Sequence, residues 1–320
     1  MADVAEIPYD KITDDIGGYR SDSLWRITLR RLFRQRSAKV GMVILAILTF
    51  TAIFAPVIAP YDPTAVLIGV EDVKKREAPC IHALGCPTDR PQHYFGTDGN
   101  VRDLFSRMVY GARVSLRIGF IVVTFAGVIG TALGAVAAYS GGWIDNIIMR
   151  VMDIFLAFPF LLLSISIVFV LGRSLTNAML AIAIVSIPAY ARVIRSTVLS
   201  LREAEYVEAS RAAGATDFQI LFGRILPNAL PPLIVLATLG VATAILDTAA
   251  LSFLGLGAQP PTPEWGTMLG SERNQLFSAP HLVFIPGIAI SLTVLGFNLL
   301  GDGLRDALDP RLTNAGAKSR

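Results

Sequence analysis

The sequence predicts an all-α membrane protein with six transmembrane helices, and its composition and hydropathy pattern are the reasons. Of the 320 residues, 53% are hydrophobic and only 17% are charged, whereas soluble domains average about 45–50% and about 25%. The mean hydropathy is +0.57, and the apolar residues are gathered in long runs. These runs lack the alternation of apolar and polar residues that strands of a membrane barrel need. A soluble enzyme, a disordered chain and a disulfide-rich miniprotein are therefore disfavoured.

Six segments satisfy the length criterion for a membrane-spanning helix, which is about 20 mostly apolar residues. They are 40–60, 114–139, 146–171, 175–199, 226–254 and 281–301. Prolines such as Pro188 and Pro231 interrupt or flank the fourth and fifth segments. Membrane helices tolerate proline because neighbouring groups satisfy the freed carbonyl.

The distribution of lysine and arginine predicts the orientation. With six spans, 18 of the 28 basic residues fall on the side that holds both termini. Most of the others lie in or beside one long loop on the opposite face. Cytoplasmic loops carry the excess of basic residues, so both termini are expected in the cytoplasm.

The predicted organisation follows from these spans. It comprises a cytoplasmic N-terminal segment (1–38), the first transmembrane helix (39–60), an outer loop (61–112), a five-helix core with a cytoplasmic loop at 200–225 (113–302), and a cytoplasmic tail (303–320). In the first segment, residues 23–36 place apolar side chains among arginines. This pattern predicts a helix lying in the membrane interface, and a basic flank that only fixes topology is the alternative.

The outer loop contains both cysteines, Cys80 and Cys86. In an oxidising compartment, a disulfide closing this short segment is expected. Free thiols and a metal site with His82 and His93 remain alternatives. The spacing does not match that of zinc fingers, so no metal site is assigned, and the histidines are expected to be solvated and inert.

The segment 200–225 is polar, rich in Ala and Glu, and helix-prone. Gly214 is a predicted helix break, and Thr216-Asp217 is a predicted restart. Two short helices meeting at Gly214 would project from the membrane. The apolar residues of this segment indicate docking into another protein, while an ordinary cytoplasmic linker is the alternative.

The same segment resembles the EAA loop of ABC importer membrane subunits. The resemblance rests on Glu208-Ala209-Ser210, on Gly214, and on Leu226-Pro227 twelve residues after that glycine. In that family the loop forms a coupling helix, which sits in a cleft of the ATP-binding subunit. The chain departs from the pattern where Ser210 replaces the second alanine and Arg224 replaces isoleucine. The resemblance assigns the coupling role to Glu205, Tyr206, Glu208, Ala209, Ser210, Ala213, Gly214, Ala215, Phe218, Leu226 and Pro227.

Further segments resemble the dipeptide/oligopeptide/nickel branch of these permeases, of the DppC and OppC type. They are FAPVIAPYDP, HYFGTDGNVRDLFSRMVYGARVSL, MDIFLAFP, ARVIRSTVLSLREAEYVEASRAAGA, ALSFLGLG and NLLGDGLRDALDPRL, and they occur in the expected order over most of residues 40–312. The cysteine-bearing insertion at 71–90 is not a general feature of the family.

The resemblance implies a type I ABC importer permease fold in the bacterial inner membrane, with di- or oligopeptides as cargo. It also implies a homologous permease partner of the DppB or OppB type, two ATP-binding subunits of the DppD/DppF or OppD/OppF type, and an extracytoplasmic substrate-binding protein. Nickel or glutathione import is the alternative. A stand-alone secondary transporter or a non-transporting membrane scaffold fits less well.

Several other activities find no support in the residues. A G-x-x-x-x-G-K-[ST] phosphate-binding loop is absent, and no Gly-Lys pair occurs. We therefore expect that this chain binds no cofactor. ATP and Mg²⁺ are expected on partner ATPase subunits. No Ser-His-Asp, H-E-x-x-H or redox C-x-x-C motif supports an enzyme. Nucleic-acid binding is not expected, because the basic residues flank membrane spans.

One acidic residue falls deep within a predicted span. Ionisable residues inside spans usually pair with a partner or face a cavity. Asp247 is therefore expected either to face the translocation path or a partner subunit, or to be satisfied by Thr243, Thr248 or a basic group. Arg150 and Asp153 are expected to pair along one helix. Arg192 and Arg195 are expected to extend to the inner membrane surface.

Overall fold

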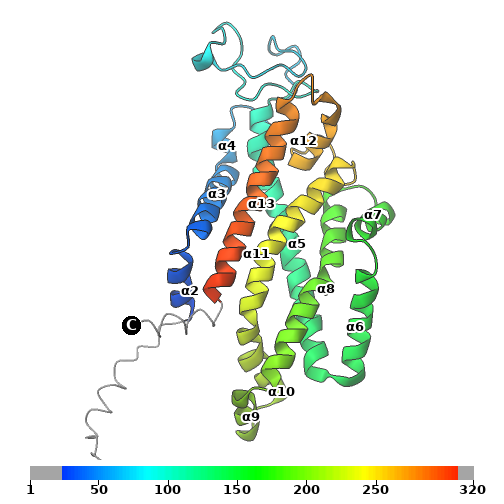
Figure 1. Ribbon diagram of the computed structural model, residues 1–320. Helices are drawn as coiled ribbons and strands as arrows, with labels where there is room; N and C mark the ends of the chain where they lie inside the picture. Colours follow the sequence, from blue (N-terminus) through cyan, green and yellow to red (C-terminus); the bar gives the residue numbers. More distant parts are fainter. Residues whose placement is uncertain (1–23, 309–320) are drawn as a thin grey trace, which may run out of the picture.

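The fold is an elongated bundle of helices, seen in a computed structural model that describes residues 24–308. The outer loop lies at one end, and two short helices lie at the other (Figure 1). Within the described range the sole β-structure is isolated bridges. The predictions for residues 1–23 and 309–320 concern parts of the chain outside that range.

The helices appear in the following order along the chain. They are α2 (Leu24–Leu32), α3 (Arg36–Ile53), α4 (Ala55–Ile58), α5 (Leu104–Ser140), α6 (Gly142–Leu156), α7 (Phe160–Leu171), α8 (Leu175–Arg202), α9 (Glu205–Ala212), α10 (Asp217–Ile220), α11 (Leu226–Phe253), α12 (Trp265–Ser271) and α13 (His281–Leu308). A π-helical turn, Leu221–Ile225, joins α10 to α11.

Five of the predicted spans are single helical runs long and apolar enough to cross a membrane, and the third is not. The run predicted at 146–171 consists of α6 and α7, which are bent by 92°. The bend follows Ala157-Phe158, and Pro159 precedes the first residue of α7. The residue before a proline is disfavoured in helical conformation, so a straight span is wrong here. The described chain has six spans if the bent pair counts as one.

Two boundaries also differ from the prediction. Helix α5 begins at Leu104, so the last part of the predicted outer loop (61–112) belongs to this helix. The start is fixed by Asp103, whose carboxylate accepts a hydrogen bond of 2.7 Å from the backbone N–H of Ser106. A side-chain acceptor of this kind satisfies an orphan donor of the first turn. At the other end, α13 continues past residue 302 to Leu308.

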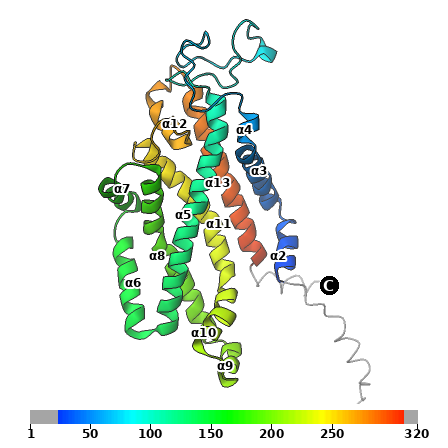
Figure 2. The ribbon, with the colours of Figure 1, turned by 180° about the vertical axis from the view of Figure 1, so that it is seen from behind.

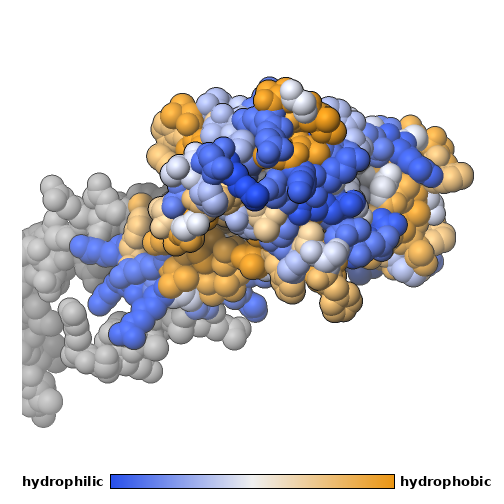
Figure 3. All heavy atoms as spheres, turned by 90° about the horizontal axis from the view of Figure 1, so that it is seen from above, coloured by the Kyte–Doolittle hydropathy of each residue, from blue (hydrophilic) through white to orange (hydrophobic). Residues whose placement is uncertain are grey.

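Helix α2 packs on the end of α13. Leu32 is buried with Ala38 and Ala307, while Leu29 and Phe33 remain exposed. Helices α3 and α13 lie side by side at one edge of the bundle, and α6 and α7 lie at the opposite edge (Figures 1 and 2). Seen from the outer end, hydrophilic residues dominate the middle of the surface and hydrophobic residues surround it (Figure 3).

The centre of the bundle is the packing of α5 on α8. Two glycines of α5 allow the two helices to approach closely, because a side chain at either position would collide with the backbone of α8. A Cβ atom on Gly130 would lie 2.8 Å from the carbonyl oxygen of Ile187, and one on Gly134 would collide with the carbonyl of Ala191. Small residues four apart are the usual device for close helix contact in membranes.

We expect Gly134→Ala to lower the melting temperature of the purified protein, because the two helices must move apart. Overpacking of this kind costs about 1–3 kcal/mol. Gly127→Ala is the matched control, since its Cβ would contact Tyr190 at an ordinary 3.7 Å. Equal melting temperatures for the two variants would show that close α5–α8 contact is not required.

Candidate functional site

A projecting turn, formed by α9 and α10, lies at the end of the bundle opposite the outer loop (Figure 1). Helix α9 ends at Ala212, and Gly214 has φ +83°, a left-handed conformation. The backbone N–H of Ala215 donates to the carbonyl of Ser210 at 3.1 Å, and that of Gly214 to the carbonyl of Arg211 at 2.9 Å. Glycine is the usual residue at such a helix end because it lacks the Cβ penalty. The break lies where the sequence predicts it.

The start of α10 after Thr216 is also determined by residues close in sequence. The Thr216 hydroxyl accepts from the backbone N–H of Gln219, and the Gln219 side chain accepts from the N–H of Thr216. This reciprocal pair is a capping box. The Tyr139 hydroxyl donates to the carboxylate of Asp217 at 2.6 Å and so ties the turn to α5. Val207, Ile220 and Ile225 are completely buried beneath it.

The projecting turn exposes two aromatic rings beside a hollow. Phe218 is 70% exposed and Phe222 51%, and their ring centroids lie 4.5 Å apart. A hollow of about 610 Å³ beside them is lined by Ser210, Ala213, Ala215, Phe218, Gln219, Phe222, Gly223 and Arg224. Four residues predicted for the coupling role therefore meet there.

The other residues with that assignment are spread over the turn. Glu205, Tyr206, Glu208 and Ala209 are exposed on α9, and Leu226 and Pro227 begin α11. Ser210 fits in place of alanine because its hydroxyl donates to the carbonyl of Tyr206 at 2.7 Å. Arg224 is exposed, and the adjacent Ile225 fills the core.

Two ion pairs that the sequence did not predict join α6 to α8. Arg195 donates to both carboxylate oxygens of Asp145 at 2.6 Å, and Arg192 donates to Asp153 at 2.7 Å. The predicted pair of Arg150 with Asp153 is therefore wrong. Arg192 and Arg195 instead bind carboxylates of the neighbouring helix. No local signal could identify partners so far apart in sequence.

A cavity of about 300 Å³ lies between α5, α8, α11 and the bend between α6 and α7. Asp247 lines it and is partly buried. The Thr243 hydroxyl donates to the carbonyl of Gly240, and that of Thr248 to the carbonyl of Ala244. Neither threonine satisfies Asp247. Among residues 24–308, no basic side chain pairs with it either.

The outer loop holds a buried histidine, contrary to the expectation of solvated histidines. His93 is 3% exposed. Its Nδ1 lies 2.8 Å from Asp103 Oδ1, and its Nε2 lies 3.1 Å from Glu71 Oε2. A ring that donates to two carboxylates carries protons on both nitrogens. Burial lowers the pKa of His93, but Asp103 and Glu71 outweigh it, so the net shift is above the ordinary 6.5.

The raised pKa of His93 predicts a pH-dependent contribution to stability. The contribution is fully present below the unfolded value of 6.5 and disappears as pH rises through the higher folded pKa. The difference in melting temperature between the wild type and His93→Gln should shrink as the pH rises from about 6 to 9. His82→Gln is the control, because His82 bonds only the carbonyl of Arg90. A difference that stays constant with pH would contradict the imidazolium assignment.

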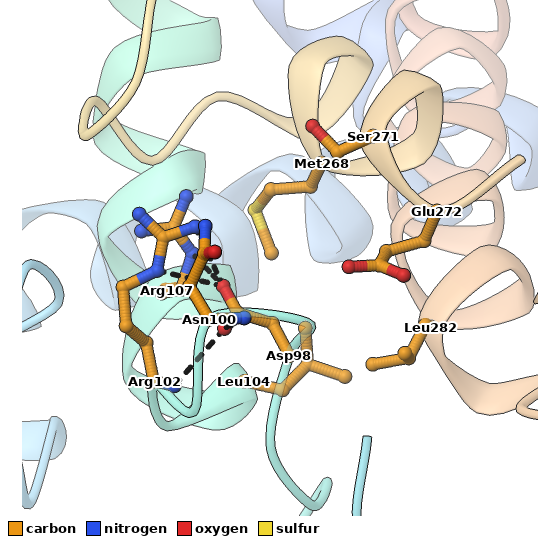
Figure 4. Close-up of a pocket in the computed structure, with 9 residues that line it drawn as sticks. All are labelled: Asp98, Asn100, Arg102, Leu104, Arg107, Met268, Ser271, Glu272 and Leu282. Carbon is orange, nitrogen blue, oxygen red and sulfur yellow. Dashed lines mark hydrogen bonds and ion pairs between the residues drawn. The ribbon is translucent and has the colours of Figure 1, made fainter. Parts of the chain in front are cut away.

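A second cluster fixes the outer loop to α5 and α12 (Figure 4). Asp98 receives an ion pair of 2.7 Å from Arg102 and one of 3.4 Å from Arg107. Arg107 also donates to the carbonyls of Pro63 and Pro261. Glu272, which follows α12, accepts from Arg76 at 2.8 Å and from the N–H of Gly99 at 2.9 Å. These contacts hold the loop over the end of the bundle.

Cys80 and Cys86 form a disulfide with a Cα–Cα distance of 5.4 Å. Both cysteines are therefore oxidised, and neither is a free thiol or a thiolate ligand for a metal. Both nitrogens of His93 are bound to carboxylates, and His82 Nε2 is bound to a carbonyl. Within residues 24–308, no group of three or more His, Cys, Asp or Glu side chains has an arrangement that could hold a metal ion.

Two protein families match this chain, and together they cover most of its length. Residues 130–314 match the family described as binding-protein-dependent transport system inner membrane component. The chain belongs to this family. Residues 23–79 match the N-terminal transmembrane domain of oligopeptide transport permease C. Members form the membrane part of an ABC importer, whose ATP-binding subunits are separate and whose cargo is delivered by a binding protein.

Relatives of this permease family cover almost the whole chain. The dipeptide transport system permease DppC of Alkalihalophilus pseudofirmus is 48% identical over 92% of this chain and 92% of its own length. DppC of Haemophilus influenzae is 47% identical over 88% and 92%. The glutathione transport system permease GsiD of Escherichia coli is 44% identical over 90% and 91%.

Solved structures show the same permease fold. The inward-facing MetNI methionine ABC transporter matches with a TM-score of 0.52 at 24% identity, over 64% of this chain and 98% of the other. A second crystal form of that transporter matches with a TM-score of 0.54 at 23% identity, over 63% and 96%. At this identity the likeness shows the fold alone. The prediction of a type I ABC importer permease fold is confirmed.

Proposed function

We propose that this chain is the permease subunit through which an ATP-driven importer moves di- and oligopeptides across the bacterial inner membrane. The observation that carries the proposal is the 47–48% identity to dipeptide permeases over nearly the whole of both chains. A relative that transports glutathione is 44% identical, so glutathione is the second candidate cargo. Both are small peptides with a free amino group.

The projecting turn is suited to transmit force from an ATPase. Its core residues pack under it, the Tyr139–Asp217 bond fastens it to α5, and the π-helical turn continues directly into α11. Helices α5 and α11 both line the cavity that holds Asp247. A displacement of Phe218 and Phe222 by a docked partner would therefore move two walls of the cavity together.

The proposed assembly follows from that geometry. Two ATP-binding subunits of the DppD/DppF type would hold ATP and Mg²⁺ and receive the turn formed by α9 and α10. A homologous permease of the DppB type would supply the other half of the path, and an extracytoplasmic binding protein would deliver cargo to the outer loop. Both termini would then lie in the cytoplasm, as the positive-inside rule requires.

Uptake in cells separates the two cargoes. In a strain that lacks this chain, we expect loss of radiolabelled dipeptide uptake and its restoration by the plasmid-borne gene. Glutathione uptake should change little. Selective loss of glutathione uptake would reassign the cargo, and unchanged uptake of both would refute the proposed function.

A further inference from the structure

The cavity between α5, α8 and α11 combines apolar walls with a single charged side chain of this chain, that of Asp247. Val122 and Val123 of α5, Phe160 of α7 and Leu236 of α11 contribute to the walls. Its volume of about 300 Å³ lies at the lower end of the range for small-ligand pockets. Asp247 lies six residues before Phe253, the last residue of α11. That end of α11 lies toward the outer loop (Figure 1).

The Asp247 carboxylate has no partner among the described residues. Two of the three hydroxyls that line the cavity bond elsewhere, since Ser186 donates to the carbonyl of Ile182 at 2.7 Å and Thr243 to that of Gly240 at 3.0 Å. The third, that of Tyr190, makes no hydrogen bond to Asp247. Arg192 and Arg195 of α8 are engaged with Asp153 and Asp145. An ionised group inside a membrane protein is costly unless it is paired. A positive charge from outside the described residues would offset that cost.

We propose that Asp247 is the acceptor for the ammonium group of the transported peptide, so that this cavity is a subsite for the cargo's amino terminus. The inference deepens the proposed function and rests on it. A carboxylate forms strong charge-assisted hydrogen bonds to an ammonium group. The apolar walls present no further charge to the cargo's side chain, so peptides of different sequence can enter. The charge that every free peptide carries is the feature recognised.

The alternative source of counter-charge is a basic side chain of the partner permease. That alternative predicts a different phenotype, because removing one member of an interfacial pair weakens the assembly. Assembly and cargo contact are therefore measured separately. Asp247→Asn keeps the size of the side chain and removes its charge, and Asp247→Glu restores the charge.

The test uses the complete importer in proteoliposomes with saturating binding protein and a dipeptide that carries a photoreactive diazirine side chain. Uptake and light-induced cross-links to this chain are both recorded. Asp247→Asn should lower uptake about tenfold and reduce cross-links to residues 236–247, while Asp247→Glu should recover much of both. The control is Asp302→Asn, which removes an exposed acidic side chain on a different helix, α13. Its uptake and cross-linking should resemble those of the wild type.

Each contrary result has a distinct meaning. Wild-type uptake and cross-linking in Asp247→Asn would overturn the subsite. Loss of the partner permease from the purified Asp247→Asn complex would assign the carboxylate to a subunit contact and would also overturn it. If the wild-type complex imports no peptide at all, the proposed function fails and this inference fails with it.

Discussion

Replacing Gly214 by leucine should abolish ATP-coupled uptake while leaving the permease folded and inserted. Gly214 has φ +83°, which costs an L-residue about 1–2 kcal/mol. A Cβ added there meets no atom of this chain within 4 Å, so the variant should fold. The new side chain would instead project from the surface that we assign to the ATP-binding subunit. We expect uptake and cargo-stimulated ATP hydrolysis in the reconstituted complex to fall about tenfold or more.

The matched control is Gly142→Leu. Gly142 also has a positive φ, +56°, and open space around its Cβ position, but it is the first residue of α6 and lies outside the turn formed by α9 and α10. Its backbone strain should be similar and its uptake near the wild-type value. If both variants lose uptake equally, the loss comes from strain and not from a blocked contact. Normal uptake by Gly214→Leu would remove this turn from the coupling path.

The largest loss of stability is expected from Asp98→Ala. Its carboxylate is 8% exposed and forms ion pairs with both Arg102 and Arg107, whose side chains are 10% and 3% exposed. Removing one partner leaves two buried positive charges, and breaking a buried pair in this way costs about 3–5 kcal/mol. The variant should melt at a much lower temperature or fail to accumulate in the membrane. Asp98→Asn, which keeps an oxygen acceptor, should be intermediate.

Asp62→Ala controls for the loss of an acidic residue in the same loop. Asp62 holds a local turn through the backbone N–H and hydroxyl of Thr64, and it is exposed. Surface substitutions of this kind usually change stability by less than about 0.5 kcal/mol. Equal stability of the Asp98 and Asp62 variants would contradict the role assigned to the buried cluster.

The features that the sequence predicted well are those with local causes. Gly214 ends α9 and Thr216 starts α10 through bonds within a few residues, so Gly214 and the pair Thr216-Asp217 were sufficient to predict the break and the restart. Apolar runs likewise revealed most spans. The bend between α6 and α7 was missed because a continuous apolar run hides it, although Pro159 offered a signal.

The features that the sequence did not predict depend on residues distant along the chain. Arg192 and Arg195 bind carboxylates on another helix, and His93 is buried because Glu71 and Asp103 meet around it. The charge of each residue was visible, but its partner was not. Asp247 was recognised as an unusual intramembrane acid. Its position on a cavity wall depends on the packing of four other helices, α5, α6, α7 and α8.

Proteoliposome transport tests the central claim most directly. This chain, its homologous permease partner, the ATP-binding subunits and the binding protein are reconstituted together, with ATP supplied on the side of the ATP-binding subunits. The account predicts dipeptide uptake that stops when any one component or ATP is left out. Uptake by this chain alone, without ATP or partners, would contradict it and identify a stand-alone transporter.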